Sequence, residues 1–332
     1  METTPPLNQA EMALARHHTY TLLSRLYLNG IRVDLLSYLQ ALPPLAAHLP
    51  DSFHADLETN LSEAAADHHN LFGFNVFPFE SVFLDPTGLL GGAITERVNN
   101  TYQQTGFHMT QNADHIGHEL AFLAFLSGAE ADAWEDNMVA IAFRMRHIQR
   151  DFLQTHLLCW LPCFNIALQR QASPFYAQLA QLTLELGHNH YRDLSLDLMA
   201  QSVEPTLSPP PPLGDLSEDS SKVKEIASYL ATPPYSGFYI SRHDIALLGR
   251  EKRLPRGFGS RQQMLSNLLR VASQYDELSA LFLSVQELLE AWQAAYANIK
   301  ATQPALAPFT QIWLARTRQT MQLMQEIRFT LK

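Results

Sequence analysis

Residues 114–119 bring four ionisable side chains together in one short run, Asp-His-Ile-Gly-His-Glu. In a helix, residues four apart share a face, so Asp114 would lie beside His118 and His115 beside Glu119. The turns that follow are entirely apolar, which is typical of a buried helix. The run therefore predicts a helix start that presents carboxylates and imidazoles at the mouth of an apolar cavity.

Three interpretations of this run stay open. Its polar groups can cap the helix and hold neighbouring helices through a buried His–Glu hydrogen bond. Alternatively, His115, His118 and Glu119 could bind the metal ion of a metal-dependent hydrolase, although the His-Glu-x-x-His order of the zincins is absent. In the third interpretation, the carboxylates accept hydrogen bonds from a cationic segment of a partner.

A second cluster of polar and aromatic residues lies within residues 151–164. His156 and Trp160 are four residues apart and share a face of the predicted helix. Pro162 is expected to begin or to kink the next helix, because proline lacks the N–H of a helix interior. The two cysteines of the chain also lie here, and we expect buried thiols rather than a disulfide or a metal pair.

Residues 71–85 are rich in phenylalanine and are interrupted by glycine and proline. This pattern is too irregular for a long helix and too aromatic for a flexible loop. Two interpretations follow: a loop that fills the core, or the apolar wall of a peptide-binding groove. In the second, Phe74, Phe77 and Phe79 would line the groove.

Most of the chain has the spacing of amphipathic helices, and the persistent alternation typical of strands is absent. We therefore predict an all-α fold, a helical bundle with an additional C-terminal helical region. No apolar stretch approaches the roughly 18 residues of a membrane span, and the N-terminus does not resemble a signal peptide, so we expect a cytoplasmic protein. The ranges expected to be helical are 11–29, 33–42, 51–70, 114–128, 130–156, 158–171, 174–200, 221–230, 241–251, 260–275, 278–300 and 306–330.

Four consecutive prolines, at positions 209–212, interrupt the helical pattern and favour polyproline II. They predict three parts: a helical domain over residues 1–203, a proline-rich linker over 204–220, and a basic helical region over 221–332. Soon after the linker, residues 233–239 predict a turn with exposed aromatic side chains.

The charge of the chain is divided unequally between these parts. The formal charge of −10 argues against a general nucleic-acid binder. Residues 1–220 carry 25 acidic and 9 basic side chains, a charge of −16, whereas residues 221–332 carry 8 and 14, a charge of +6. The acidic part suits a cationic partner. Since an exposed ion pair contributes only about 0 to 1 kcal/mol, apolar burial would have to supply most of the affinity.

The basic part contains a cluster of cations around a Gly-Phe-Gly turn. It can form a solvated loop or one docked on the acidic part, or it can receive an anion, such as a phosphate or an acidic patch of a partner. The Gly-x-x-x-x-Gly-Lys-Ser/Thr order of a phosphate-binding loop is absent. The cluster consists of Arg250, Lys252, Arg253, Arg256 and Arg261.

The first two clusters, in their order and separation, resemble the TorD/DmsD/NarJ family of redox-enzyme maturation chaperones. The family pattern has an Asp-His pair, a Glu four residues after the His, and about 30 residues further on the order Phe-Leu-x-x-His-Leu-x-x-Trp-x-Pro-x-Phe. This sequence has Asp114-His115, Glu119, Phe152-Leu153, His156-Leu157, Trp160, Pro162 and Phe164.

The runs Arg25-Leu26-Tyr27 and Pro78-Phe79-Glu80-Ser81-Val82 are also similar to the family. The resemblance ends near residue 205, which leaves a C-terminal extension. One departure concerns Asn112, because family members often have a proline two residues before the Asp-His pair.

The resemblance implies a chaperone rather than an enzyme. Such a protein binds the apo form of a molybdopterin oxidoreductase, often at its twin-arginine signal peptide, and withholds export until the cofactor is loaded. By the motif match, Asp114 and His115 are expected to contact the leader, and Glu119 either contacts it or is structural. We expect no cofactor or metal. The residues expected to support the site from behind are Tyr27, Glu80, His156 and Trp160.

Two alternatives to the chaperone stay open. One is the metal-dependent hydrolase described above. The other is a helical adaptor that associates with a folded partner and does not bind an isolated leader peptide.

Overall fold

The computed structural model describes residues 8–49, 57–88, 90–109, 111–198, 205–211, 220–255 and 257–330, and these are mostly helical. No strand occurs among them, and an isolated bridge pairs Phe79 with His115. The predicted all-α fold is therefore confirmed. None of the described helices is both long and apolar enough to cross a membrane.

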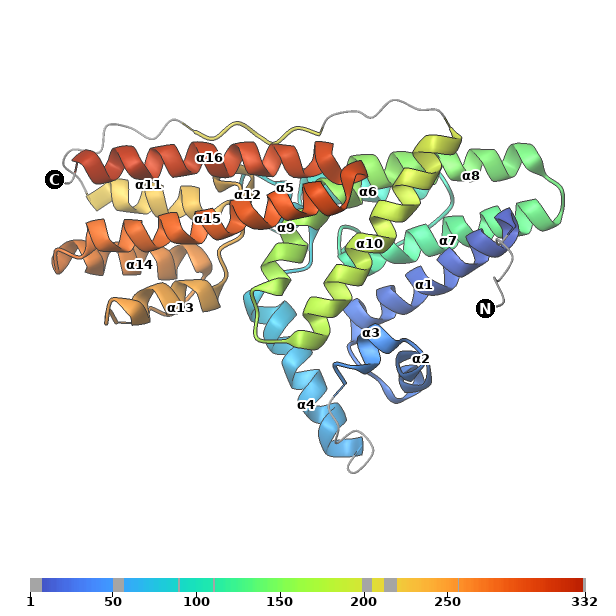
Figure 1. Ribbon diagram of the computed structural model, residues 1–332, viewed down its shortest axis with the longest axis horizontal. Helices are drawn as coiled ribbons and strands as arrows, with labels where there is room; N and C mark the ends of the chain where they lie inside the picture. Colours follow the sequence, from blue (N-terminus) through green and yellow to red (C-terminus); the bar gives the residue numbers. More distant parts are fainter. Residues whose placement is uncertain are drawn as a thin grey trace.

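The helices of the N-terminal half are built around the antiparallel pair α1 and α7, which pack along one another (Figure 1). Helix α1 begins with a capping box in which Asn8 and Glu11 satisfy each other's backbone N–H groups. The helical elements are α1 (Gln9–Asn29), η1 (Val33–Leu35), α2 (Leu36–Gln40), α3 (Pro43–Ala46), α4 (Leu57–Asn70), α5 (Glu80–Leu84), α6 (Ala93–Gln103), α7 (Ile116–Glu135), α8 (Val139–Phe152), α9 (Leu158–Gln169) and α10 (Pro174–Asp197).

The helices of this half differ in places from the sequence-based expectation. The sequence separated two helices near residue 129, but α7 continues to Glu135 and the turn forms at Asn137. Asn137 has a φ of 57°, a left-handed conformation that asparagine tolerates better than most residues. Helix α6, which the sequence did not predict, lies between the two glycines 91–92 and Gly106.

Pro162 lies inside α9 instead of beginning a new helix. An irregular turn precedes this helix, where residues Leu153–Leu157 form the π-helical turn η4. Cys159 and Cys163 are buried free thiols, as the sequence predicted.

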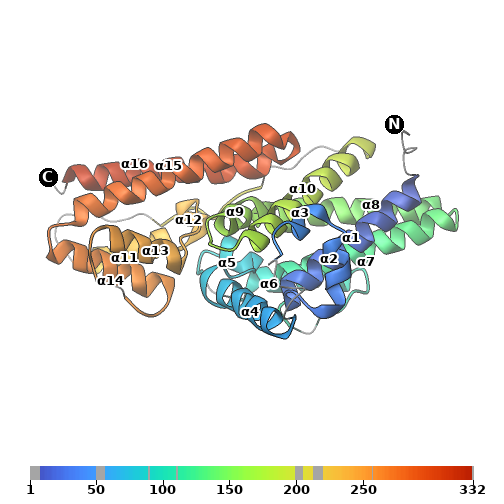
Figure 2. The same cartoon turned by 60° about the horizontal axis from the view of Figure 1, so that its bottom comes forward.

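The C-terminal helices lie at one end of the elongated molecule, and α1, α7 and α8 lie at the other, as both views show (Figures 1 and 2). Elements α5, α9 and α12 lie between the two ends. The C-terminal elements are α11 (Ser220–Ala231), α12 (Pro233–Ser236), α13 (Arg242–Glu251), α14 (Arg261–Gln274), α15 (Leu278–Thr302), η5 (Pro304–Leu306) and α16 (Ala307–Thr330).

One hydrophobic core runs through both ends of the molecule. At the junction, the indole Nε1 of Trp313 on α16 donates a hydrogen bond of 2.9 Å to the carbonyl of Cys159 on α9. Phe238 and Tyr239 are fully buried there, so the expectation of an exposed aromatic turn was wrong. The two rings pack against neighbours that come from distant parts of the sequence, Trp292 and Phe83 respectively. The division into domains at residues 203 and 220 stays a prediction.

Candidate functional site

The loop that precedes α5 and the loop that precedes α7 pair antiparallel. The backbone N–H of Ile116 donates to the carbonyl of Pro78 at 2.9 Å, and the N–H of Glu80 donates to the carbonyl of Asp114 at 2.9 Å. These bonds flank the bridge between Phe79 and His115. The Phe-rich segment and the Asp-His pair are therefore held together as one unit.

The carboxylate of Asp114 points into the protein, with 1% of the residue exposed. Its Oδ2 accepts from the backbone N–H of Ser81 at 3.0 Å, and its Oδ1 accepts from the hydroxyl of Thr95 at 2.6 Å. Since Ser81 lies in the first turn of α5, the carboxylate satisfies an N–H group that the helix leaves free. Asp114 therefore fixes α5 and α6 to the start of α7.

His115 is the N-cap residue of α7 and is partly exposed. Its Nδ1 accepts from the backbone N–H of Gly117 at 3.0 Å, which places the proton of the neutral ring on Nε2. The ring meets that of Phe79 edge to face at 4.9 Å between centroids. Burial, followed by the nearby histidines 118 and 68, lowers the pKa of His115 to about 3, so the ring is neutral at pH 7.

Asn112, two residues before the Asp-His pair, has a φ of 55°. Its carbonyl accepts from the backbone N–H of His115 at 3.0 Å and lies 2.8 Å from Nδ1 of His118. A proline could not adopt this conformation, because its ring fixes φ near −65°. Asn112 therefore stands in a turn that the proline often found in the family at this position could not form.

A buried polar network lies behind the two loops and is centred on Glu80. Glu80 is fully buried, and its carboxylate lies 3.1 Å from Nδ1 of His156 and 3.3 Å from a guanidinium nitrogen of Arg97. The other ring nitrogen of His156 lies 3.2 Å from the hydroxyl of Thr101. The network connects α5, α6 and η4 across 76 residues of sequence.

Glu119 is also fully buried and accepts a hydrogen bond of 3.3 Å from the indole Nε1 of Trp160. Burial raises the pKa of its carboxyl well above the ordinary value, and the carboxyl groups of Glu80 and Asp114 raise it further. Burial therefore favours the neutral form of Glu119. Its carboxyl group faces Trp160 inside the protein and not a partner.

Tyr27 is likewise buried, in a different part of the core. Its hydroxyl lies 3.1 Å from that of Thr183 on α10, and its ring packs on Phe72 and Phe164. The structure thus places Glu80, His156 and Trp160 directly behind the two loops, while Tyr27 supports the buried end of the Phe-rich segment.

The Phe-rich segment presents some of its rings outward and buries others. Phe74 is 43% exposed, and Phe77 and Phe79 are partly exposed. Phe72 and Phe83 belong to the core. The three residues predicted to line a groove are therefore the three that reach the surface.

Tyr239 of the C-terminal region holds this segment in place. Its hydroxyl donates to the carbonyl of Asn75 at 2.9 Å and accepts from the N–H of Phe77 at 3.3 Å. Its ring stacks on Phe83 at 5.0 Å. The sequence did not indicate this contact, because the two partners lie more than 150 residues apart.

The metal-site interpretation finds no support in the donor geometry. Glu119 points to Trp160, whereas the Nδ1 atoms of His115 and His118 are engaged with backbone groups. Within the described residues, no group of three or more His, Cys, Asp or Glu side chains is arranged to hold a metal ion.

The predicted basic cluster is divided by the structure. Arg250 and Arg253 are exposed and Lys252 is partly exposed, whereas Arg261 is 9% exposed at the start of α14. Arg256 lies outside the described residues. The cluster is therefore not one surface patch, and Arg261 points into the protein near Tyr239.

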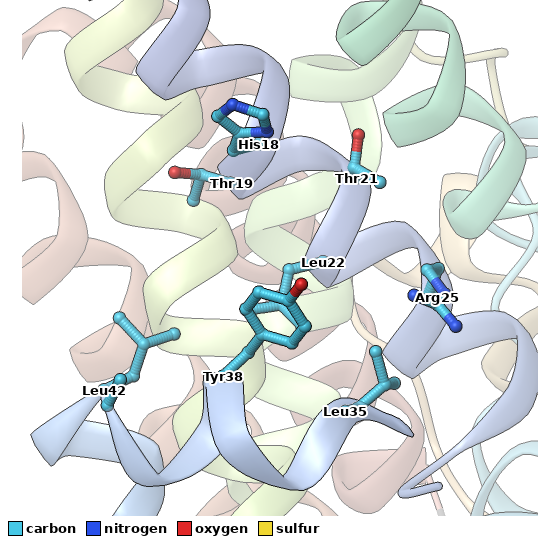
Figure 3. A pocket seen from close by; sticks show the side chains of 9 residues that line it. His18, Thr19, Thr21, Leu22, Arg25, Leu35, Tyr38 and Leu42 are labelled. Carbon is cyan, nitrogen blue, oxygen red and sulfur yellow. The ribbon is translucent and has the colours of Figure 1, made fainter. Parts of the chain in front are cut away.

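A hollow of about 350 Å³ lies between α1 and α2 (Figure 3). Leu22, Leu35, Tyr38 and Leu42 form much of its wall, and Arg25 closes one side. None of the residues predicted to bind a leader lines it.

The fold and the site define an all-α protein in which an Asp-His pair fastens an aromatic loop to a buried polar network. Residues 36–165 match the family described as nitrate reductase delta subunit. The match over these residues agrees with the resemblance to the TorD/DmsD/NarJ family that the motifs predicted.

Curated relatives agree with this assignment. The chain is 28% identical over 186 residues to Chaperone protein TorD of Vibrio cholerae serotype O1 (strain ATCC 39541 / Classical Ogawa 395 / O395), which covers 53% of the chain and 80% of the relative. It is 27% identical over 184 residues to Chaperone protein TorD of Vibrio parahaemolyticus serotype O3:K6, which covers 53% and 82%. No solved structure matches significantly. The C-terminal helices lie beyond the family match.

Proposed function

We propose that this protein is a cytoplasmic chaperone, not an enzyme, that binds the apo form of a molybdopterin oxidoreductase and assists its maturation before export. The observation that carries the proposal is the family match over residues 36–165, together with relatives named as TorD chaperones. The client enzyme's twin-arginine signal peptide is the proposed target.

The proposed leader surface consists of His115 and the exposed rings Phe74, Phe77 and Phe79. Phe79 packs edge to face against His115 at the start of α7, and Phe74 and Phe77 lie a few residues earlier in the same Phe-rich segment, where both reach the surface. Burying apolar leader residues on the rings contributes about 25 cal/mol for each Å² removed from water. The Nε2–H of the neutral His115 ring supplies a hydrogen-bond donor.

In this proposal, Asp114 and Glu119 act indirectly. Both carboxyl groups are turned inward, so Asp114 positions the loops and Glu119 supports Trp160. The net charge of −16 over residues 1–220 then increases the rate and sets the orientation of encounter with a cationic leader, without a direct buried ion pair.

Calorimetry with the leader peptide of a molybdoenzyme encoded near this gene tests the proposal. Phe74→Ala is expected to weaken binding about tenfold, which corresponds to about 1.4 kcal/mol. His115→Asn keeps a side-chain acceptor at the N-cap and removes the ring. It is therefore expected to weaken leader binding with little loss of protein stability.

The matched control is Tyr38→Ala, which removes an exposed ring that lies in the hollow between α1 and α2. It is expected to leave leader binding unchanged. Binding of the folded client without any binding of the leader would favour the helical adaptor. Hydrolase activity that depends on added metal, and is lost in His118→Ala, would overturn the proposal.

A further inference from the structure

Two arginines at the junction with the C-terminal helices have no carboxylate partner in the part of the chain that the structure describes. Arg261 is 9% exposed, donates a hydrogen bond of 3.2 Å to the carbonyl of Ile240 and lies over the Tyr239 ring at 4.0 Å. Arg242 lies 5.7 Å from the Phe74 ring, and its buried Nε has no hydrogen-bond partner among the described residues. Neither forms an ion pair within the described part of the chain.

The nearest acidic residue along the chain does not neutralise these charges. Asp244 is 4% exposed, accepts hydrogen bonds from Ser241 and forms an ion pair with Arg170 at 3.1 Å. Arg242 also occupies the first position of α13, where the helix dipole disfavours a cation. Two cations are thus held close to the interior without the anion that would offset the cost of burial.

Both arginines line a cavity of about 360 Å³ between the Phe-rich segment and the C-terminal helices. This volume falls in the range of small-molecule sites. None of the described residues that line the cavity is acidic. Its other walls are formed by Phe77, Val82, Thr87, Gly88, Leu90, Ala231, Thr232, Ser260 and Gln262.

The first turn of α14 adds backbone donors to this cavity. The hydroxyl of its N-cap residue Ser260 accepts from the N–H of Gln263 at 3.2 Å. No acceptor in the described residues takes the N–H groups of Arg261 and Gln262, which precede it. Free N–H groups at the start of a 14-residue helix favour an anion.

We propose that this cavity binds a small molecule that carries a phosphate group. A guanidinium fork matches two phosphate oxygens, and two such forks with helix N–H groups suit a dianion better than a single carboxylate. The apolar wall at Phe77, Val82 and Leu90 would cover a nonpolar or aromatic remainder of the ligand. The positive charge of the C-terminal region would then have a defined partner.

The test uses the full-length protein and calorimetry with inorganic phosphate, pyrophosphate and phenyl phosphate at low ionic strength. Saturable binding is expected for all three, and Arg242→Gln is expected to weaken each at least tenfold. The Arg242 side chain gives up no hydrogen bond to any residue that the structure describes, so its variant should fold. Arg261→Gln should weaken binding as well, but it also loses the bond to Ile240.

The matched control is Arg250→Gln, which removes the same charge from an exposed position on the same helix. It is expected to change binding less than twofold. Leu90→Ala, at a residue 55% exposed, should weaken phenyl phosphate and leave inorganic phosphate unchanged. The proposal is overturned if no phosphate compound binds, if Arg242→Gln and Arg250→Gln weaken binding equally, or if acetate and benzoate bind as tightly as their phosphate counterparts.

Discussion

The Nδ1 atom of His156 lies 3.1 Å from Oε2 of Glu80, and both residues are almost fully buried. Glu80 is the first residue of α5, and His156 lies in the π-helical turn before α9. The contact joins the Phe-rich segment to the second cluster, residues 151–164. A substitution in either of these regions is therefore expected to affect the other.

Glu80→Ala should therefore be strongly destabilising. It leaves His156 and one side of Arg97 without their buried acceptor, and an unsatisfied buried polar group typically costs about 1 to 3 kcal/mol. Urea unfolding followed by circular dichroism measures the loss. Arg97→Ala is the control: its side chain is 56% exposed, so the change should cost less than about 1 kcal/mol. Equal losses for the two variants would show that Glu80 is stabilised mainly by its exposed partner.

The helices could largely be predicted from the sequence, whereas the roles of the polar side chains could not. From residue 220 on, long amphipathic patterns place α13 to α16 within two residues of their observed ends. The direction of the Asp114 carboxylate depends on Ser81 and Thr95, which lie 33 and 19 residues away. A local pattern does not contain contacts of this kind.

The basic cluster is a second case in which spacing along the sequence does not predict the neighbours in space. Spacing placed Arg261 with the cations around residue 253, but its neighbours in space are Ile240 and Tyr239. Arg242, the second arginine of the cavity, stood outside any charged run in the sequence. Only the packing of α13 and α14 against the Phe-rich segment brings the two together.

The stability of the protein should fall as the pH is lowered from about 6.5. The pKa of His115 is about 3 in the folded protein and about 6.5 when the chain is unfolded, so below pH 6.5 the unfolded state binds a proton that the folded state excludes. Above pH 6.5 the neutral His115 ring takes nothing from the unfolding free energy. Between pH 6.5 and pH 3, the unfolding free energy falls by up to about 1.4 kcal/mol for each pH unit.

His115→Asn isolates that term from other buried histidines, such as His190, whose pKa is lowered too. Between pH 7.5 and 5, the variant should lose about 2 kcal/mol less unfolding free energy than the parent. Urea titrations at the two pH values measure the difference. The same loss in parent and variant would mean that His115 becomes protonated without unfolding.

Gly117→Ala should disturb the contact between α1 and α7. A Cβ atom at this position would lie 2.5 Å from Cγ of Leu28, which is closer than real carbon contacts. Overpacking of this kind typically costs about 1 to 3 kcal/mol. The double variant with Leu28→Ala should recover much of the loss in thermal unfolding, because the clashing atoms are gone. Additive effects of the two substitutions would place the strain elsewhere.

Tyr239→Phe should loosen the Phe-rich segment without disrupting the core. The ring would still stack on Phe83, but the carbonyl of Asn75 and the N–H of Phe77 would lose their partner, at a cost of about 1 to 3 kcal/mol. Hydrogen exchange should accelerate at residues 75–77, and leader binding should weaken because the rings are less well positioned. Tyr235→Phe is the control, since no hydrogen bond is made by its hydroxyl within the described residues, and it should change stability by less than about 0.5 kcal/mol. Faster exchange spread evenly over the chain in Tyr239→Phe would instead indicate global destabilisation and no specific support of the segment.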